Sequence, residues 1–409
     1  MKKAIKCGKL LDTLNKKVLT DQVILIEDDR ITAVESLRGF EAPEGCEIID
    51  LSDKFVMPGL IDSHVHLAYD KSTAFFMRDA AGTVMVDTLM RAKKNMLAGF
   101  TMVRDCGCVH YVGVSARDAI KKGLAWGPRI AACGWPMMAT ADIGFAPHIT
   151  GQLSPNHIVD GVENIRQFTR EVVRNHVDFV KMMVTAGVMS PGDEPGGQRY
   201  TEQEVRAAAE IADLHGLPFS CHAHGARGIK TAVRAGATSI EHCTMADEEG
   251  IHMMAERGTY LVPTIVATVG IAEQPKGSLP ANIFKKLDIC MAHHKGAVQL
   301  AVKEGVKFAF GTDAATPGNT HGTQTREFGL MVDYGLSTMD ALLSATVNGA
   351  DLNRVSKDLG SITPGKYADV VAYSEDPFDD ISTMNRVNFV MKGGEVYKRD
   401  GEALYPITL

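Results

Sequence analysis

The sequence predicts an α/β fold, namely a closed (β/α)8 TIM-type barrel with a small β-sandwich domain built from both termini. Three observations favour this fold. Short apolar runs alternate with segments of helical spacing through the middle of the chain. Period-two segments occur again at both ends of the chain. Histidine, lysine or aspartate follows several of the apolar runs, at the strand ends where a parallel barrel places its functional groups.

The two ends of the chain share one β-type pattern. Val23–Ile26 is a short apolar segment bounded by turn residues, and Ala368–Tyr373 has the same character. The pair Gly393-Gly394 is a hairpin signal, because glycine tolerates the positive φ of a two-residue turn. We therefore expect residues 1–57 and 358–409 to form one composite β-sandwich domain.

Residues 58–357 are expected to form the barrel. Helices are predicted between the apolar runs; one of them, Thr201–Ile211, begins with a capping-box pattern. Repeated βα units favour a closed barrel over an open sheet. The predicted strands end near His66, Asp105, Gly134, Lys181, His222, His242, Pro263 and Asp313.

Composition restricts the class of protein. An apolar fraction of 45% and a charged fraction of 23% are typical of a globular chain with a substantial core. A formal net charge of −7 argues against nucleic-acid and anionic-membrane partners, which require clustered Lys and Arg. A small-molecule substrate fits these values better, and we expect the protein to form a homo-oligomer.

The cysteines and the N-terminus indicate a cytoplasmic protein. The 8 cysteines are scattered without a C-x-x-C pair, so we interpret them as reduced thiols. Cys106-Gly107-Cys108 could serve metal or redox chemistry, but small core residues near a strand end are the simpler interpretation. The N-terminal segment has no apolar signal region, and no later run has the length of a membrane span.

The segment Val56–His66 carries the strongest functional signal. It places a His-x-His pair directly after a buried-type strand. Side chains two residues apart on a strand share a face, so His64 and His66 can bind one metal ion from a rigid support. A pair of structural histidines is the alternative.

These motifs resemble the amidohydrolase superfamily, and the resemblance extends over essentially the whole chain. Within that superfamily the chain is similar to the imidazolonepropionase-like and Xaa-Pro-dipeptidase-like branch, which includes zinc dipeptidases and N-acyl amino acid hydrolases. The residues that carry the resemblance are Pro58–His66, Lys181, His222, His242, Gly311–Asp313 and Gly360–Asp369.

The resemblance implies a site for two divalent metal ions, and zinc is the expected metal. Lys181 would bridge the ions after carboxylation by carbon dioxide or bicarbonate, because a protonated amine has no lone pair for a cation. A buried structural lysine is the alternative. The implied ligands of the more buried ion are His64, His66 and Asp313, and those of the second ion are His222 and His242.

Three of these assignments have an alternative interpretation. His222 and His224 share one strand face, and the family pattern selects His222 as the ligand. His242 could instead be a satisfied core histidine. Asp313 could merely cap the following helix, since aspartate is a favoured N-cap residue.

The implied reaction is hydrolysis of the amide bond of a dipeptide or N-acyl amino acid. A hydroxide that bridges the metals would attack, while Asp313 would accept the proton and pass it to the departing amine. Hydrolysis of a cyclic amide or lactone is an alternative. Deamination is another, although Gly225 occupies the position where deaminases of the superfamily typically carry a glutamate. A non-catalytic scaffold would have lost ligands, and none is missing here.

Substrate recognition is expected from the loops that follow the strands. Candidate substrate-binding residues are His148, His224, Arg227 and His321. Arg227 could pair with a substrate carboxylate through its planar guanidinium, although a surface arginine at the start of a helix is the simpler interpretation. For the histidines, ordinary loop or supporting roles are the alternative.

Overall fold

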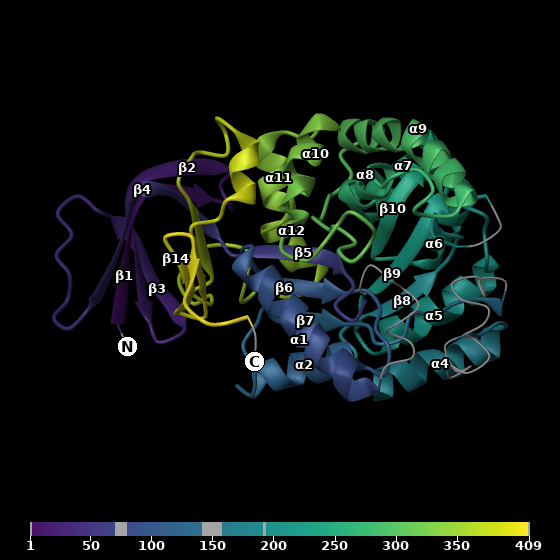
Figure 1. The fold of residues 1–409 in the computed structure, drawn as a ribbon, viewed down its shortest axis with the longest axis horizontal. Helices are drawn as coiled ribbons and strands as arrows, with labels where there is room; N and C mark the ends of the chain where they lie inside the picture. Colours follow the sequence, from purple (N-terminus) through teal and green to yellow (C-terminus); the bar gives the residue numbers. More distant parts are fainter. Residues whose placement is uncertain (1, 70–79, 141–157, 191–193, 408–409) are drawn as a thin grey trace.

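The computed structural model describes residues 2–69, 80–140, 158–190 and 194–407. A mostly antiparallel sheet forms one end of the molecule, and parallel strands surrounded by helices form the other (Figure 1). This arrangement is the α/β class that the sequence predicts, with the functional residues in the parallel part.

Both termini contribute to a single eight-stranded sheet with the order β15-β14-β13-β12-β4-β1-β2-β3. The two halves meet at β4, which pairs in parallel with β1 and antiparallel with β12. A composite terminal sheet is thus present, whereas its division into the two layers of a sandwich remains a prediction. The strands are β1 (Lys2–Asp12), β2 (Lys17–Glu27), β3 (Arg30–Ser36), β4 (Glu47–Pro58), β12 (Val370–Tyr373), β13 (Phe389–Lys392), β14 (Glu395–Arg399) and β15 (Glu402–Ala403).

The hairpin predicted at Gly393-Gly394 is confirmed. β13 and β14 pair antiparallel, with Lys392 opposite Glu395, so the two glycines form the turn. Their φ angles are 55° and 75°, a left-handed conformation that glycine adopts without steric cost. This turn sets the register of the C-terminal strands.

The strands in the middle of the chain form two parallel sheets, with the strand orders β5-β6-β7 and β11-β10-β9-β8. Every strand-like run predicted there is a regular strand except the last, which ends at Asp313. That last segment is still hydrogen-bonded on both sides, because Leu261 N donates to Lys307 O (2.9 Å) and Ser63 N donates to Phe310 O (2.7 Å). The strands are β5 (Leu60–Val65), β6 (Phe100–Asp105), β7 (Arg129–Ala132), β8 (Val180–Met183), β9 (Phe219–Gly225), β10 (Ser239–Met245) and β11 (Tyr260–Val262).

Helices surround these parallel strands (Figure 1). The capping box predicted at Thr201 is confirmed, since its side chain accepts from Glu204 N and the Glu204 side chain accepts in return, at the start of α5. The helices are α1 (Ala81–Leu97), α2 (Val112–Lys121), α4 (Val162–Arg174), α5 (Glu202–Leu214), α6 (Ala226–Ala235), α7 (Glu248–Arg257), α8 (Ile265–Ala272), α9 (Ala281–Lys303), α10 (Glu327–Asp333), α11 (Thr338–Ser344) and α12 (Val347–Leu352), with short 3-10 turns η3 (Gln324–Arg326) and η4 (Ile381–Asn385).

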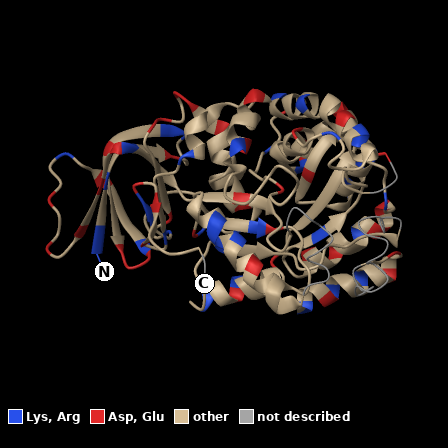
Figure 2. Cartoon of the chain, viewed as in Figure 1, with Lys and Arg blue, Asp and Glu red and all other residues tan. Residues whose placement is uncertain are grey.

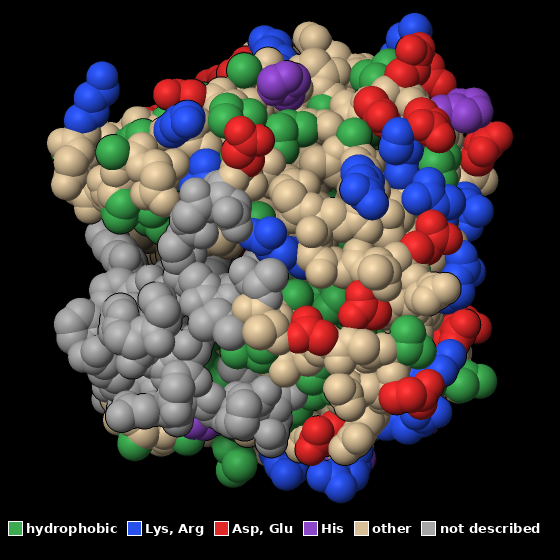
Figure 3. All heavy atoms as spheres, turned by 90° about the vertical axis from the view of Figure 1, so that its right-hand side faces the viewer, with side chains coloured by type: hydrophobic (Ala, Val, Ile, Leu, Met, Phe, Trp, Pro, Cys, Tyr) green, Lys and Arg blue, Asp and Glu red, His purple; other side chains and the backbone are tan. Residues whose placement is uncertain are grey.

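Charged residues lie mostly on the outer helices and loops. Figure 2 shows acidic and basic positions interspersed along the helices, and Figure 3 shows the same mixture on one face of the molecule. In the described part of the chain, no helix combines the length and the apolar character needed to cross a membrane. All of the cysteines are free thiols, as the sequence predicts.

Candidate metal centre

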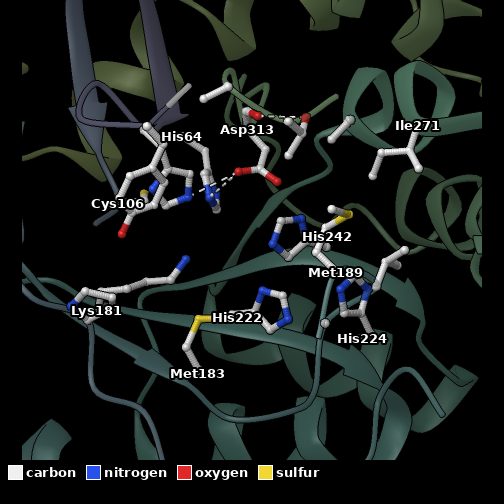
Figure 4. Close-up of a pocket in the computed structure, with 18 of the residues that line it drawn as sticks. His64, Cys106, Lys181, Met183, Met189, His222, His224, His242, Ile271 and Asp313 are labelled. Carbon is white, nitrogen blue, oxygen red and sulfur yellow. Dashed lines mark hydrogen bonds and ion pairs between the residues drawn. The ribbon is translucent and has the colours of Figure 1, made fainter. Parts of the chain in front are cut away.

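A cavity of about 180 Å³ lies at the ends of the parallel strands and collects residues from both parallel sheets. The polar side chains at its base come from β5, β8, β9 and β10 and from the segment that ends at Asp313. Figure 4 shows these side chains pointing toward a common space. All the metal ligands predicted from the sequence line this cavity: His64, His66, Lys181, His222, His242 and Asp313.

The first group of possible ligands is His64, His66 and Asp313, whose ligand atoms lie within 4.8 Å of one another. Asp313 Oδ1 is 3.2 Å from His66 Nε2 and 3.5 Å from His64 Nε2. His64 lies in β5 and His66 directly follows its last residue, so the alternation of extended backbone turns both imidazoles to the same side. Asp313 has a φ of 56°, and its backbone N–H donates to His64 O (2.7 Å), which holds the carboxylate beside the two rings.

The second group is His222, His224 and His242, also within 4.8 Å of one another. β9 and β10 are parallel neighbours with Glu241 opposite His222, so the rings of His222 and His242 approach to 4.5 Å between centroids. His224 stacks on His242 at 4.9 Å. The Nε2 atom of His222 is buried without a hydrogen-bond partner in the described structure, which fits a nitrogen meant for a metal ion.

Lys181 lies in β8, on the side of the cavity between the two groups (Figure 4). Its side chain is only 2% exposed. Within the described ranges its amine makes no hydrogen bond or ion pair. The amine faces the cavity, so this position is compatible with a chemical form of the lysine that interacts with a cation.

Burial keeps His64, His222 and His242 neutral. It lowers the pKa of His64 to about 4 and places the pKa values of His222 and His242 well below the usual value for histidine. Neutral imidazole is the form that donates a lone pair to a metal. The donor set and its protonation states therefore fit divalent cations.

Asp313 remains ionised in the same environment. Burial acts to raise the pKa of Asp313, but the hydrogen bond from His66 and the charges of His66 and Lys181 outweigh that effect, so this pKa lies below its usual value. An ionised carboxylate at this position can bind a cation or accept a proton.

Glu241 contacts the nitrogen of His64 that faces away from the cavity. This residue was not predicted from the sequence as part of the site. Its Oε2 accepts from His64 Nδ1 (2.7 Å), which leaves His64 Nε2 to face the cavity. Its Oε1 accepts from Arg104 Nη2 (2.8 Å), Ser220 Oγ (2.8 Å) and Ser239 Oγ (2.5 Å). Because both carboxylate oxygens are occupied by protein donors, Glu241 orients a ligand rather than serving as one.

A signal for Glu241 was available in the sequence. A charged residue stands inside the apolar strand Ser239–Met245, which belongs to a parallel sheet buried on both faces. Such a residue is almost never buried without a partner or a function. Its partner Arg104 carries the same signal, because it stands inside the buried parallel strand Phe100–Asp105.

The other histidines also have partners for their second nitrogen. His242 Nδ1 lies 2.7 Å from Thr264 Oγ1, and His224 Nδ1 lies 2.9 Å from Thr244 Oγ1. Thr264 precedes α8, whose first N–H groups at Ile265 and Val266 are held by the buried carboxylate of Glu327. These contacts fix the ring orientations before any ligand binds.

The residues predicted to contact substrate are distributed differently. His224 lines the cavity. Arg227 is exposed on α6, and His321 is held by Asn95 and by the backbone carbonyl of His66; neither lines the cavity. His148 lies outside the described residues. The predicted contact of His148 therefore stays a prediction, and of the three candidates that are described only His224 lines the cavity.

Replacement of Glu241 by Gln tests its supporting role. The amide keeps the shape of the side chain but removes the charge that pairs with Arg104 and accepts from His64. We expect metal affinity to fall about 10- to 100-fold, as for other buried partners of ligand histidines. Competition with a chelating dye measures the affinity, and the exposed Glu248→Gln is the matched control. Unchanged affinity in a folded Glu241→Gln protein would contradict the orienting role.

The chain matches the model of the amidohydrolase family over residues 55–397. Ochratoxinase from Aspergillus niger is 30% identical over 376 residues, which cover 85% of this chain and 76% of that protein. Imidazolonepropionase from Geobacillus sp. (strain WCH70) is 25% identical over 422 residues, covering 95% of this chain and 92% of the relative.

Solved structures agree with this relationship. The crystal structure of a Xaa-Pro dipeptidase with bound methionine in the active site superposes with a TM-score of 0.90 at 34% identity, covering 97% of this chain and 100% of that one. A. niger ochratoxinase superposes with a TM-score of 0.86 at 28% identity, covering 97% and 96% of the two chains. With these matches and a cavity lined by histidines and an aspartate, the chain belongs to the amidohydrolase family and is a hydrolase.

Proposed function

We propose that the protein is a binuclear metal-dependent hydrolase that cleaves the amide bond of a dipeptide or an N-acyl amino acid. The observation that carries this proposal is the presence of two groups of possible ligands in one cavity that Lys181 also lines. The likeness to a Xaa-Pro dipeptidase at 34% identity supports the choice of substrate class.

The residues that would hold the ions follow from the two groups. His64, His66 and Asp313 would hold one ion, and His222 and His242 would hold the other. The buried Nε2 of His222, which has no hydrogen-bond partner in the described structure, supports its assignment as a ligand.

Lys181 would bind both ions as a carbamate. Carboxylation by carbon dioxide replaces a buried cation with two acceptor oxygens, and so removes the cost of an unpaired ammonium group among neutral histidines. We propose zinc as the native metal, because imidazole nitrogen and carboxylate oxygen are common zinc ligands.

When bound, a pair of divalent cations lowers the pKa of water and polarises the substrate carbonyl. Asp313 then acts as the general base and afterwards as the general acid: its carboxylate takes the proton of the attacking water and gives it to the leaving amine. His224 lines the cavity beside His242, where it can donate a hydrogen bond to the substrate. The products are a carboxylate and a protonated amine, which takes up both protons of the water, so atoms and charges balance.

We also infer that the two parallel sheets are arcs of one closed barrel. The hydrogen bonds of segment 307–313 to β11 and β5 support one junction. A bond from Met137 N to Lys181 O (2.9 Å) supports the other, between the ends of β7 and β8. Closure would explain how ligands from strands far apart in sequence face one cavity. The domain bounds 1–57, 58–357 and 358–409 remain part of this proposal.

Metal removal tests the centre itself. We expect zinc-loaded protein to contain about two ions per chain by elemental analysis, and exhaustive chelation to abolish amide hydrolysis and lower the melting temperature, because the ions bind only the folded state. Readdition of zinc with bicarbonate should restore both properties. A metal-free protein of unchanged activity would refute the proposal.

A substrate panel tests the reaction. Dipeptides, N-acyl amino acids and cyclic ureides are offered to the zinc-loaded protein, and product amines are quantified. The imidazolonepropionase relatives, at about a quarter identity, make a cyclic amide the second candidate. Turnover of cyclic ureides alone would replace the proposed substrate class with that one.

A further inference from the structure

One side of the cavity is formed by apolar groups. We call Val188, Met189, Ala267, Thr268 and Ile271 the apolar wall. It combines the segment after β8 with α8. Figure 4 shows Met189 and Ile271 on the side of His224 and His242, away from Lys181. A substrate amide held at the metal centre would therefore place one of its two substituents against this surface.

The apolar wall is backed by a packed cluster. Val188 and Ile271 are 6% and 3% exposed and pack with Ile283, Leu287 and Cys290 of α9, while Met189 is half-buried against the same cluster. Lys286 of α9 also donates to the backbone carbonyl of Ser190, which ties the segment after β8 to the helix. The apolar wall is therefore already in place before a substrate binds. Binding does not have to include the entropic cost of ordering these side chains.

The apolar wall offers no charge to a substrate. The hydroxyl of Thr268 donates to Ile265 O (2.9 Å), so its polar group is used within α8. Apart from the histidines, the charged side chains among the described residues that line the cavity are Lys181 and Asp313, both part of the metal centre. A charged substituent at this surface would lose its water without gaining a partner, whereas an apolar one gains from leaving water.

We infer that the apolar wall selects substrates with an uncharged, apolar amino-acid side chain or acyl group next to the scissile amide. This inference rests on the proposed function and narrows it. It concerns specificity, so Val188, Met189, Ala267 and Ile271 are specificity-determining residues that take no part in the proton transfer.

Matched substrates test the preference. N-acetyl derivatives of leucine, methionine and phenylalanine are compared with those of aspartate and lysine on the zinc-loaded protein. We expect kcat/KM to be on the order of 100-fold higher for the apolar members. Values within tenfold of one another across the panel would overturn the inference while leaving the proposed function intact. If the protein hydrolysed no amide, the proposed function would fail and the inference with it.

A binding measurement distinguishes a failure of the specificity inference from a failure of the proposed hydrolase function. Free methionine and free aspartate are products of such amides and need no turnover to bind. We expect methionine, at millimolar concentration, to raise the melting temperature of the zinc-loaded protein more than aspartate does. An equal or reversed effect would overturn the inference whatever the activity.

A negative charge placed on the apolar wall should invert the preference for apolar over cationic substrates. Met189→Glu is expected to lower kcat/KM for N-acetyl-leucine at least about tenfold and to raise the relative rate for Nα-acetyl-lysine. Met291→Glu is the matched control, because Met291 is half-buried against the same cluster but does not line the cavity. It should keep the wild-type ratio between the two substrates. An unchanged ratio in folded Met189→Glu, or the same inversion in Met291→Glu, would contradict the assignment.

Discussion

Asp313→Asn is expected to lower kcat by about 10²- to 10⁴-fold with little change in KM, the range in which a positioned acid or base contributes to a reaction. The amide keeps an oxygen that can face a cation, but it cannot accept the proton of the attacking water. Its carboxylate stands 3.2 Å from His66 Nε2 at the edge of the cavity, where the substrate amide would lie.

The variant must be compared at equal metal content. Elemental analysis should find close to the wild-type amount of zinc, and the exposed Asp288→Asn on α9 should retain full activity. Normal turnover in Asp313→Asn would refute the proton-transfer role. A loss of activity fully explained by lost metal would also contradict it and would leave Asp313 as a ligand alone.

Lys181→Ala is expected to lower metal content below two ions per chain and to reduce activity by at least about 100-fold, more than the loss of a residue that only supports a ligand. The reason is that the carbamate would supply a ligand oxygen to each ion. Lys230→Ala is a suitable control, since Lys230 forms exposed ion pairs with Asp247 and Glu249 outside the cavity.

Two measurements address the carbamate directly. Wild-type protein reconstituted with ¹³C-bicarbonate should show a carbamate signal by NMR that Lys181→Ala lacks. Acetate should restore part of the activity of Lys181→Ala, because it supplies a carboxylate to the space that the side chain leaves. Full metal content and activity in Lys181→Ala would show that the lysine is structural.

Much of the centre could be predicted from local pattern. His64 and His66 are separated by one residue at the end of an apolar strand, and strand geometry alone turns them to one side. Lys181, His222 and His242 each stand in a predicted strand that the structure confirms as β8, β9 or β10. A parallel barrel gathers such strand ends at one mouth, and the resemblance to the amidohydrolase superfamily implied which of these residues hold metal.

Two residues predicted to contact substrate, Arg227 and His321, do not line the cavity. Neither position could be predicted from the local sequence pattern. Arg227 is only three positions beyond His224, but the chain enters α6 at Ala226 and the helix leaves Arg227 exposed. His321 follows the last predicted strand, yet both its nitrogens are taken by Asn95 and by the backbone of His66. The direction of a side chain in a loop depends on what packs beside it, and spacing carries no information about that.

The sequence by itself determined the donor types, their positions at strand ends and the α/β class, because apolar periodicity and residue chemistry are properties of short segments. Only the tertiary structure decided which donors meet and what supports them. His64 and Glu241 are 177 residues apart in the chain and 2.7 Å apart in space. The apolar wall likewise joins the segment after β8 to α8. Such contacts arise from the packing of whole strands and helices against one another, which no single segment specifies.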